Sequence, residues 1–575
     1  MNVLKSFPAA LPLIAAAACS PAPEPKMTYP ETRKGDLVED YHGTKIADPC
    51  RWMEDLDSKE VADWVARQNE VTFGYLDKLP MRAAVHVAHH RALELSARRA
   101  AGEEGGRYFY QKNTGLQRQS PLFVRASLTS EPALVIDPNV ISPDGSLSLS
   151  QWSPSPDGKL LAYAISEGGA DWETLHVREV DSTRDLGDEV KWVRFSNISW
   201  TNDSKGLFTR AIRSRRKGKV LEAKLSGQAL YYHRVGTPQS DDRLIYERTD
   251  MPTWFVSGTA TEDGRYLLIF MAKGSDNNNR LYYADLGDPS RPSIGAPVKP
   301  LVEDDDAEFN AFGTVGSTLY LRTDRSAPNR KVIAIDVRHP APSAWKTVVP
   351  EAKEAIESVT LIGGRIVAQY LVDVQSKLSL FGLDGERKAM SRCRAPEPSP
   401  RSAAARTSLK SCSRSARRFS QRRSSRYDPA AKTSTPFEAP TLPIDVSQFE
   451  TKQLFAPSKD GTKVPFFLTA RKGLTLDGSH PTMLYGYGGF SISTLPTYRA
   501  DVPAWLEMRR HLGDGEHARR RRVRRIVAQG RISREKAERL RRLHRRCRIP
   551  GEGKVRRRRS WASWAARTAD CWLAR

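Results

Sequence analysis

The sequence predicts a β-propeller together with at least one further domain. Between about residues 150 and 385, short apolar strands alternate with polar turns, and one turn-and-strand unit recurs imperfectly. Repetition of four-stranded units over such a length favours a propeller. A large β-sandwich assembled from the same strands is the alternative. The chain has 575 residues, which is too long for a single domain.

The repeated unit is a polar turn that contains an Asp and is followed by an apolar strand. It reads SPDGKLLAYAIS from Ser155, TNDSKGLFTRAI from Thr201 and TEDGRYLLIFMA from Thr261. Asp, Asn, Ser and Gly favour such turns because their side chains bond the local backbone or tolerate positive φ. The strand patterns STLYLRTD and GRIVAQYL continue the series further along the chain.

Residues 29–80 precede the repeats and predict a helix. Within them, SKEVADWVARQNEVTFGYLDKLP is helical in pattern, and Asp57 or Ser58 could cap its N-terminus. Four of its apolar residues fall mostly on one face: Val61, Trp64, Val65 and Phe73.

The first nineteen residues predict an export signal. A single Lys5 precedes an apolar run that is too short for a permanent transmembrane helix. The run ends in Ala-Ala-Ala-Cys19, which resembles a bacterial lipobox, and a Pro-rich spacer follows. We therefore expect an exported protein, anchored to a bacterial membrane by a lipid on Cys19. Plain cleavage, leaving a soluble periplasmic protein, is the alternative.

The net charge of +24 is concentrated in two Arg-rich islands. Residues 509–575 carry +18 and residues 391–426 carry +10, so the rest of the chain carries −4. The positive net charge of the chain therefore does not apply to the globular parts, which are mildly acidic.

The cysteines indicate neither a disulfide framework nor a metal site. Without Cys19 and those in the Arg-rich islands, a single cysteine remains, and the chain contains no CxxC and no HExxH. We expect no cofactor and no metal. The six cysteines are Cys19, Cys50, Cys393, Cys412, Cys547 and Cys571.

From Tyr427 the chain is globular again, and two strand patterns lead to a Gly-rich turn. The turn lies in PTMLYGYGGFSIS, at residues 481–493, and DYHGTKIADPCRWMED stands at residues 40–55. With the repeats between them, these motifs resemble the prolyl oligopeptidase family, serine peptidases of the α/β-hydrolase superfamily. The resemblance covers roughly residues 29–390 and 427–508.

The resemblance implies a seven-bladed β-propeller and an α/β-hydrolase domain that is incomplete in this chain. Residues 391–426 and 509–575 are expected to be disordered or non-native. The implied ranges are a signal peptide at 1–19, an N-terminal segment of the peptidase domain at 29–80, the propeller at 81–430, the start of the hydrolase domain at 431–508, and an out-of-frame tail at 509–575.

The resemblance also assigns roles to two residues. Tyr487 would contribute its hydroxyl to the oxyanion hole, and Phe490 would line the proline pocket. The family hydrolyses oligopeptides after proline with a Ser–Asp–His triad, but no GxSxG elbow follows Met508. We therefore expect a monomer that is catalytically inactive as written, and an intact form that acts on proline-containing oligopeptides.

The tail reads differently in an adjacent frame. Trp561-Ala562 and Trp564-Ala565 each force glycine across the codon junction, and Asp570-Cys571-Trp572 forces two leucines. Permitted synonymous codons give Val-Gly-Ile-Met-Gly-Gly-Ser-Asn-Gly-Gly-Leu-Leu-Val-Gly-Ala, the family's nucleophile elbow. In the other alternative reading frame, the codons of residues 518–528 and 537–551 permit amino-acid sequences that resemble segments of the family. The sequence therefore predicts a frameshifted catalytic domain.

A different class of function stays open beside this one. Arg clusters with interleaved aromatic residues can bind phosphates and stack on bases. The alternative is thus a non-enzymatic exported binding protein, with the propeller as a platform and a cationic nucleic-acid-binding tail. The frame argument favours the peptidase, so we expect no nucleic-acid partner.

Overall fold

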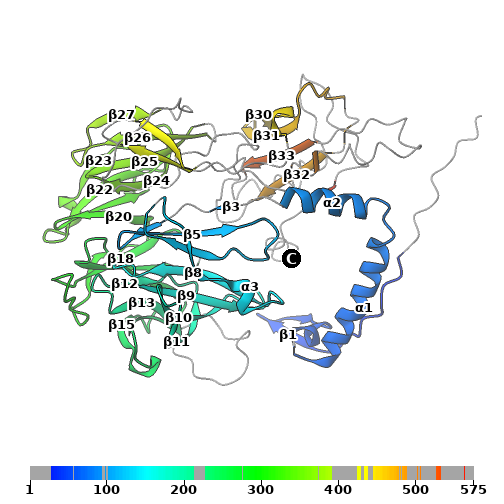
Figure 1. The fold of residues 1–575 in the computed structure, drawn as a ribbon, viewed down its shortest axis with the longest axis horizontal. Helices are drawn as coiled ribbons and strands as arrows, with labels where there is room; N and C mark the ends of the chain where they lie inside the picture. Colours follow the sequence, from blue (N-terminus) through cyan, green and yellow to red (C-terminus); the bar gives the residue numbers. More distant parts are fainter. Residues whose placement is uncertain are drawn as a thin grey trace, which may run out of the picture. The chain divides into compact units, whose positions relative to one another are not determined.

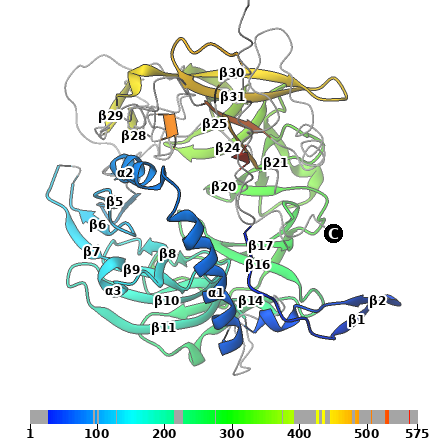
Figure 2. The same ribbon diagram turned by 90° about the vertical axis from the view of Figure 1, so that its right-hand side faces the viewer.

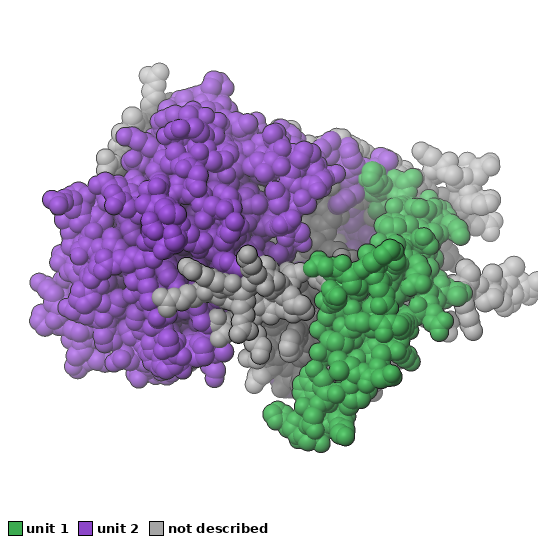
Figure 3. Space-filling view, turned by 90° about the horizontal axis from the view of Figure 1, so that it is seen from below, with its two compact units in different colours: residues 1–86 green, residues 87–575 purple. Residues whose placement is uncertain are grey.

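The computed structural model describes most of the chain up to residue 391 and separate segments beyond it. The residues described are 27–391 except 56, 94–96, 99–101, 128, 213–226, 275 and 373–374, and then 424–428, 433–437, 445–477, 480, 482–487, 502, 505–506, 526–531 and 562–563. The predicted signal segment, Cys19 and Phe490 lie outside them. The chain divides into two compact units, residues 1–86 and 87–575 (Figure 3).

The first unit contains a β-hairpin and a long helix. Its elements are β1 (Val38–Tyr41), β2 (Thr44–Ala47), the 3-10 helix η1 (Arg51–Glu54), α1 (Lys59–Leu76) and the start of α2 (Arg82–Leu93) (Figure 1). The hairpin turns through His42 and Gly43, both of which have positive φ, as a two-residue turn between twisted strands requires. No helix in the described residues is long and apolar enough to cross a membrane.

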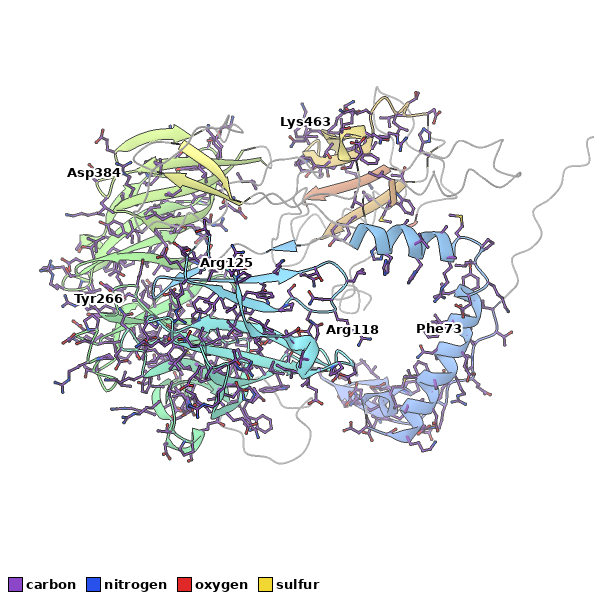
Figure 4. All side chains as sticks on the ribbon, viewed as in Figure 1. Phe73, Arg118, Arg125, Tyr266, Asp384 and Lys463 are labelled. Atoms are coloured by element: carbon purple, nitrogen blue, oxygen red, sulfur yellow. The ribbon has the colours of Figure 1, made fainter. Side chains whose placement is uncertain are left out.

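Helix α1 confirms the predicted helix and selects one of its two predicted caps. Ser58 is the N-cap, and its Oγ accepts a hydrogen bond from the Val61 amide at 3.2 Å. Val61 is buried, and the Trp64 Nε1 donates to Thr32 Oγ1 at 3.0 Å. Phe73, labelled in Figure 4, is 50% exposed, so the predicted apolar face is covered mainly near the start of the helix.

The second unit contains five antiparallel sheets that follow one another along the chain, and the second of them has eight strands and forms two blades, so there are six blades in all (Figures 1 and 2). In the described residues, a two-stranded hairpin follows the last of these sheets, and its first strand overlaps the end of residues 391–426, which were expected to be disordered or non-native. The first two blades contain β3 (Ala97–Arg98), β4 (Gly102–Glu104), β5 (Arg107–Asn113), β6 (Leu122–Arg125) and β7 (Ala133–Ile136), and then β8 (Leu147–Pro154), β9 (Leu160–Glu167), β10 (Trp172–Glu179) and β11 (Asp185–Arg194). The third and fourth blades contain β12 (Ser199–Trp200), β13 (Gly206–Ile212), β14 (Gln228–Arg234) and β15 (Arg243–Glu247), and then β16 (Trp254–Ala260), β17 (Tyr266–Lys273), β18 (Asn279–Asp285) and β19 (Lys299–Val302). The fifth and sixth blades contain β20 (Phe309–Val315), β21 (Thr318–Thr323), β22 (Lys331–Asp336) and β23 (Lys346–Val349), and then β24 (Ala355–Ile362), β25 (Arg365–Val372), β26 (Gln375–Phe381) and β27 (Arg387–Ser391), and the hairpin consists of β28 (Ser424–Asp428) and β29 (Thr433–Phe437). Short helices lie between them at α3 (Pro138–Ile141), η3 (Gln239–Asp241) and η4 (Pro342–Ala344).

Each blade packs face to face against the next, which explains the strand sequences. One core joins the fourth and fifth blades, with Tyr266 and Leu281 packed in the same cluster as Phe309 and Ile333. Equivalent cores join the other neighbouring blades from the first to the sixth. Because both faces of a blade are covered, a middle strand such as β17 reads YLLIFMA and is buried almost throughout. This stack of sheets is a β-propeller, so the β-sandwich alternative is excluded.

The predicted turn unit occurs in three successive blades with the same hydrogen bonds. Ser155, Thr201 and Thr261 each donate their hydroxyl to the Asp two residues later. Their backbone amides donate to the carbonyl five residues later, at 2.8–2.9 Å. Each turn links the first and second strands of its blade, so the sequence repeat is confirmed as a structural repeat.

The last sheet that the structure describes is mixed and has five strands. After η5 (Val446–Gln448), the sheet has the order β30 (Phe449–Pro457), β31 (Lys463–Arg471), β33 (Ile526–Arg531), β32 (Thr482–Tyr487) and β34 (Ala562–Ser563). The first two strands are antiparallel, whereas β33 and β34 run parallel to β32 on either side. Strands β33 and β34 belong to the tail for which the sequence predicts non-native structure. The rest of that tail lies outside the described residues.

Candidate functional site

The first candidate site lies at the carboxyl end of β32. Tyr487 ends this strand and pairs with Arg531, which ends β33, while β34 pairs with Met483 and Leu484 on the other side. Ligands of open α/β sheets bind outside the carboxyl ends of parallel strands where connections diverge to opposite sides. The backbone places Tyr487 at the carboxyl edge of the parallel strands of this sheet. The side chain of Tyr487 lies outside the description, as does all of Phe490.

His480, which is also close to β32, cannot serve as a base at that edge. It is buried at the amino end of the strand, where its Nε2 lies 3.1 Å from the Thr475 carbonyl oxygen. The Thr482 hydroxyl donates in turn to the His480 carbonyl at 3.1 Å. From Thr482 to Tyr487 a strand rises about 16 Å. His480 therefore anchors the turn before β32 rather than reaching the oxyanion position.

The second candidate site is a cluster of aromatic and arginine side chains in the propeller, which the sequence analysis did not identify. It draws on the second, third and fourth blades, and we call it the aromatic–arginine cluster. Its members are Trp172, Trp192, Arg194, Phe195, Arg210 and Phe255.

Guanidinium groups lie over aromatic rings in this cluster, and two of the rings also lie next to each other. The Arg194 Cζ lies 5.1 Å from the ring centroid of Trp172 and 5.0 Å from that of Phe195. The Arg210 Cζ lies 5.0 Å from the ring centroid of Phe255, and the Phe195 and Phe255 centroids are 6.1 Å apart. Cation–π contacts of this kind hold aromatic rings in place. Aromatic-lined surfaces are a common way to bind proline-containing peptides.

Two members of the cluster have strained backbones. Trp192 has φ +63° and Phe195 has φ +51°, and the Phe195 side chain is 49% exposed. A bulky residue in the left-handed region costs about 1–3 kcal/mol and persists only where its surroundings impose it. An exposed aromatic ring held in this way contributes little to the core, so its position points to binding.

The cluster carries an uncompensated positive charge. The Arg194 Nη2 donates to Asp171 Oδ2 at 2.7 Å, whereas Arg210 makes no ion pair with any residue that the structure describes. Arg210 is only 3% exposed, and burial lowers its pKa to about 10. The guanidinium donates to backbone carbonyls instead of a carboxylate.

A buried histidine between two carboxylates lies elsewhere in the propeller. The His233 Nε2 is 2.9 Å from Asp188 Oδ1, and its Nδ1 is 2.6 Å from Asp242 Oδ1. The His233 and Asp188 side chains are completely buried and that of Asp242 is 6% exposed, so no substrate can reach the imidazole. This group is therefore structural, although it combines the residue types of a catalytic dyad.

Among the residues described, no group of three or more His, Cys, Asp or Glu side chains is placed to hold a metal ion. The described part of either candidate site therefore contains no ligand set for a metal ion.

Comparison with known proteins adds a family to this geometry. The sequence profile of the prolyl oligopeptidase N-terminal β-propeller domain matches residues 29–417. Prolyl endopeptidase of Elizabethkingia meningoseptica is 30% identical over 498 residues, which is 87% of this chain and 69% of that protein. Prolyl oligopeptidase A of Amanita bisporigera is 31% identical over 530 residues, covering 83% of this chain and 67% of that protein.

Solved structures give the same result. A structure from an analysis of two prolyl endopeptidases matches this chain with a TM-score of 0.75 and 28% identity. The match covers 88% of this chain and 71% of the chain in that structure. Prolyl oligopeptidase B of Galerina marginata, bound to a 35-residue hydrolysis and macrocyclization substrate, has a TM-score of 0.74 and 26% identity. That match covers 88% of this chain and 71% of that one.

Proposed function

Because the chain belongs to the prolyl oligopeptidase family, we propose that it binds proline-containing oligopeptides and that its 575-residue form does not hydrolyse them. The observation that carries the binding half is the aromatic–arginine cluster, in which Phe195 presents a half-exposed ring. A related protein, prolyl oligopeptidase B, has been captured with a 35-residue peptide substrate. The cluster offers this chain a surface of the right chemistry for such a ligand.

The inactive half of the proposal rests on the chemistry of the family. Hydrolysis needs a serine nucleophile, a histidine that moves its proton and an aspartate that orients the histidine. Tyr487 would then stabilise the oxyanion together with a backbone amide. The sequence contains no GxSxG segment. Removing the nucleophile or the base from such a triad lowers the rate by about 10⁶-fold.

We also propose that the protein is exported and that Cys19 accepts a lipid, on the strength of the apolar run and the Ala-Ala-Ala-Cys sequence at its N-terminus. Mass spectrometry of the mature protein from a bacterial membrane fraction would detect the lipid. A mature chain that begins after an unmodified cleavage site would contradict lipidation and leave export standing.

The experiment that tests the main proposal has two readouts on the purified 575-residue chain. A fluorogenic peptide with one proline before the reporter group should give no turnover above the uncatalysed rate. A labelled, uncleaved oligopeptide with a central proline should bind, as measured by fluorescence anisotropy, and the same peptide with alanine in place of proline should bind more weakly. Clear turnover would overturn the inactive half, and equal affinity for the two peptides would overturn the binding half.

A further inference from the structure

The strained backbone at Phe195 raises the question of what holds it. Phe195 lies between β11 and β12, outside both strands, so the β-ladders do not fix its φ. Its ring is half exposed and cannot be locked by core packing. A strained conformation persists only if neighbouring groups determine it from several directions.

One residue, Arg210, makes hydrogen bonds to both neighbours of Phe195, to the backbone of the residue before it and to the side chain of the residue after it. Its Nε and Nη2 donate to the Arg194 carbonyl oxygen at 3.1 and 3.0 Å, immediately before Phe195. Its backbone amide donates to Ser196 Oγ at 2.8 Å, immediately after Phe195. Arg210 itself is fixed in the middle of β13, where it pairs with Leu230 of β14. The segment 194–196 is thus attached at both ends to one rigid strand.

Arg210 also controls the ring that Phe195 contacts. Its guanidinium lies 5.0 Å from the Phe255 ring centroid, and its Nη1 donates to the Val256 carbonyl oxygen at 3.3 Å. Phe255 in turn lies 6.1 Å from Phe195 between ring centroids. The same side chain therefore fixes the backbone of Phe195 and its aromatic neighbour in the fourth blade.

The chemistry of the position favours a role in binding over a role in stability. Arg210 is buried and makes no ion pair with a described residue, and a buried charge without a carboxylate is costly to a fold. The planar fork delivers two parallel donors to one carbonyl and a third to another blade, which neither an ammonium nor an apolar side chain can do.

We propose that Arg210 is a positioning residue that holds Phe195 in its left-handed conformation and so presents the ring to the peptide. This inference rests on the proposed peptide binding by the aromatic–arginine cluster. Arg210 need not touch the ligand, because it acts through Phe195. Loss of Arg210 should lower the fraction of molecules in the competent conformation, and the apparent affinity falls by that fraction.

A double-mutant cycle on the purified 575-residue chain tests the proposal. Arg210→Met and Phe195→Ala should each weaken binding of the proline-containing oligopeptide about tenfold. The combined variant should bind no more weakly than Phe195→Ala alone, because Arg210 acts through the missing ring. Arg210→Lys should be intermediate, since it retains the charge but has a single donor nitrogen in place of the planar fork. An equal loss from Arg210→Met in both backgrounds would overturn the proposal.

Hydrogen exchange supplies a readout that does not depend on peptide binding. In Arg210→Met, and less so in Arg210→Lys, amides of residues 192–197 should exchange faster while those of the fifth and sixth blades are unchanged. Unchanged exchange at 192–197 would overturn the proposal even where the peptide binds. If the unmodified chain binds no peptide, the proposed function fails, and the exchange result still decides whether Arg210 fixes Phe195.

A matched control is available in the fourth blade. The Arg265 guanidinium lies 5.1 Å from the Tyr266 ring centroid, so Arg265→Met also removes a guanidinium from an aromatic ring. Arg265 follows the Thr261 turn, at the opposite end of β17 from the residues that pair with Phe255. Arg265→Met should leave both the affinity and the exchange of residues 192–197 unchanged. Equal effects of the two substitutions would show that Arg210 has no special connection to Phe195.

Discussion

The Nε2 of His233 lies 2.9 Å from the Oδ1 of Asp188, and both side chains are completely buried. Asp188 belongs to β11 in the second blade and His233 to β14 in the third, so this contact joins two blades. Asp242 faces the other ring nitrogen at 2.6 Å. A protonated imidazole can donate to both carboxylates, whereas a neutral one can donate to only one. The junction therefore depends on the protonation of His233.

We predict that the free energy of unfolding falls as the pH rises from about 6.5 to about 9. Burial acts to lower the pKa of His233, but hydrogen bonds and charge attraction from Asp188 and Asp242 outweigh it and raise the pKa to about 9. Because the folded-state pKa lies above the unfolded value, the stabilisation is complete below pH 6.5 and is lost as the pH passes 9. The shift corresponds to about 3 kcal/mol. Urea unfolding followed by tryptophan fluorescence measures it.

The variant His233→Gln isolates this group from other titrating residues. Its free energy of unfolding should be lower than that of the unmodified chain at about pH 6.5 and should change less with pH up to about 9. Parallel pH profiles for the two proteins would show that His233 does not stay protonated in the fold.

At Thr261 of the repeated turn, we predict that one substitution leaves stability nearly unchanged and that another lowers it. The Thr261 hydroxyl donates to Asp263 and accepts from the Tyr266 amide at 3.0 Å. Thr261→Val removes both bonds at nearly constant volume and leaves the buried amide unpaired, which should lower stability by about 1–3 kcal/mol. Thr261→Ser should have little effect, because Ser155 makes the equivalent contacts in the second blade. Urea unfolding compares the two, and equal losses would contradict this account of the turn.

In the same turn, replacement of Gly264 should disturb the packing of the turn against the neighbouring blade. Gly264 has φ +72°, and a Cβ at this position would lie 2.5 Å from the Asn202 Cγ of the third blade. Gly274 has φ +56° with nothing within 4 Å of its Cβ position. Gly274→Ala should therefore cost about 1 kcal/mol from φ alone, and Gly264→Ala at least about 1 kcal/mol more. Thermal unfolding of both variants checks the difference. Equal destabilisation would mean that Asn202 moves aside freely.

The fold was predictable where local sequence determines local structure. The Ser155, Thr201 and Thr261 turns close through bonds within six residues, so their pattern is legible in the sequence. Ser58 caps α1 through a contact three residues away. The packing of one blade on the next depends on side chains far apart in the chain, and the sequence predicts only that apolar strands recur.

The candidate sites were predictable to a smaller extent. The resemblance led to Tyr487, and the structure gives its backbone position at the end of β32. The aromatic–arginine cluster was missed because its residues come from three different blades. The positive φ of Phe195 also cannot be recognised from the spacing of apolar residues. The segment KWVRFSN offered only a weak local signal, in the aromatic residues around Arg194.

The frameshift predicted for residues 509–575 can be tested by sequencing the gene. Sequencing the codons of residues 505–575 should show bases that give Gly-Gly-Ser-Asn-Gly-Gly in a reading frame adjacent to the one that encodes residues 561–572. The forced glycines follow from the codons of Trp and Ala and the forced leucines from those of Asp, Cys and Trp, so neither depends on the choice among synonymous codons. The serine codon should straddle Ala566 and Arg567. Any other amino acid at that junction would contradict the frameshift and favour a genuine Arg-rich tail.

A chain with its frame restored would test the role proposed for Tyr487. Its hydroxyl would act on charge that develops only in the transition state, so Tyr487→Phe should lower kcat about 10²–10³-fold with little change in KM. Phe490→Ala removes an apolar wall from the proline pocket instead, so its main effect should be a higher KM. Steady-state hydrolysis of a proline-containing fluorogenic peptide separates the two effects. A Tyr487→Phe variant with unchanged kcat would remove Tyr487 from the oxyanion hole, whatever the activity of the restored chain.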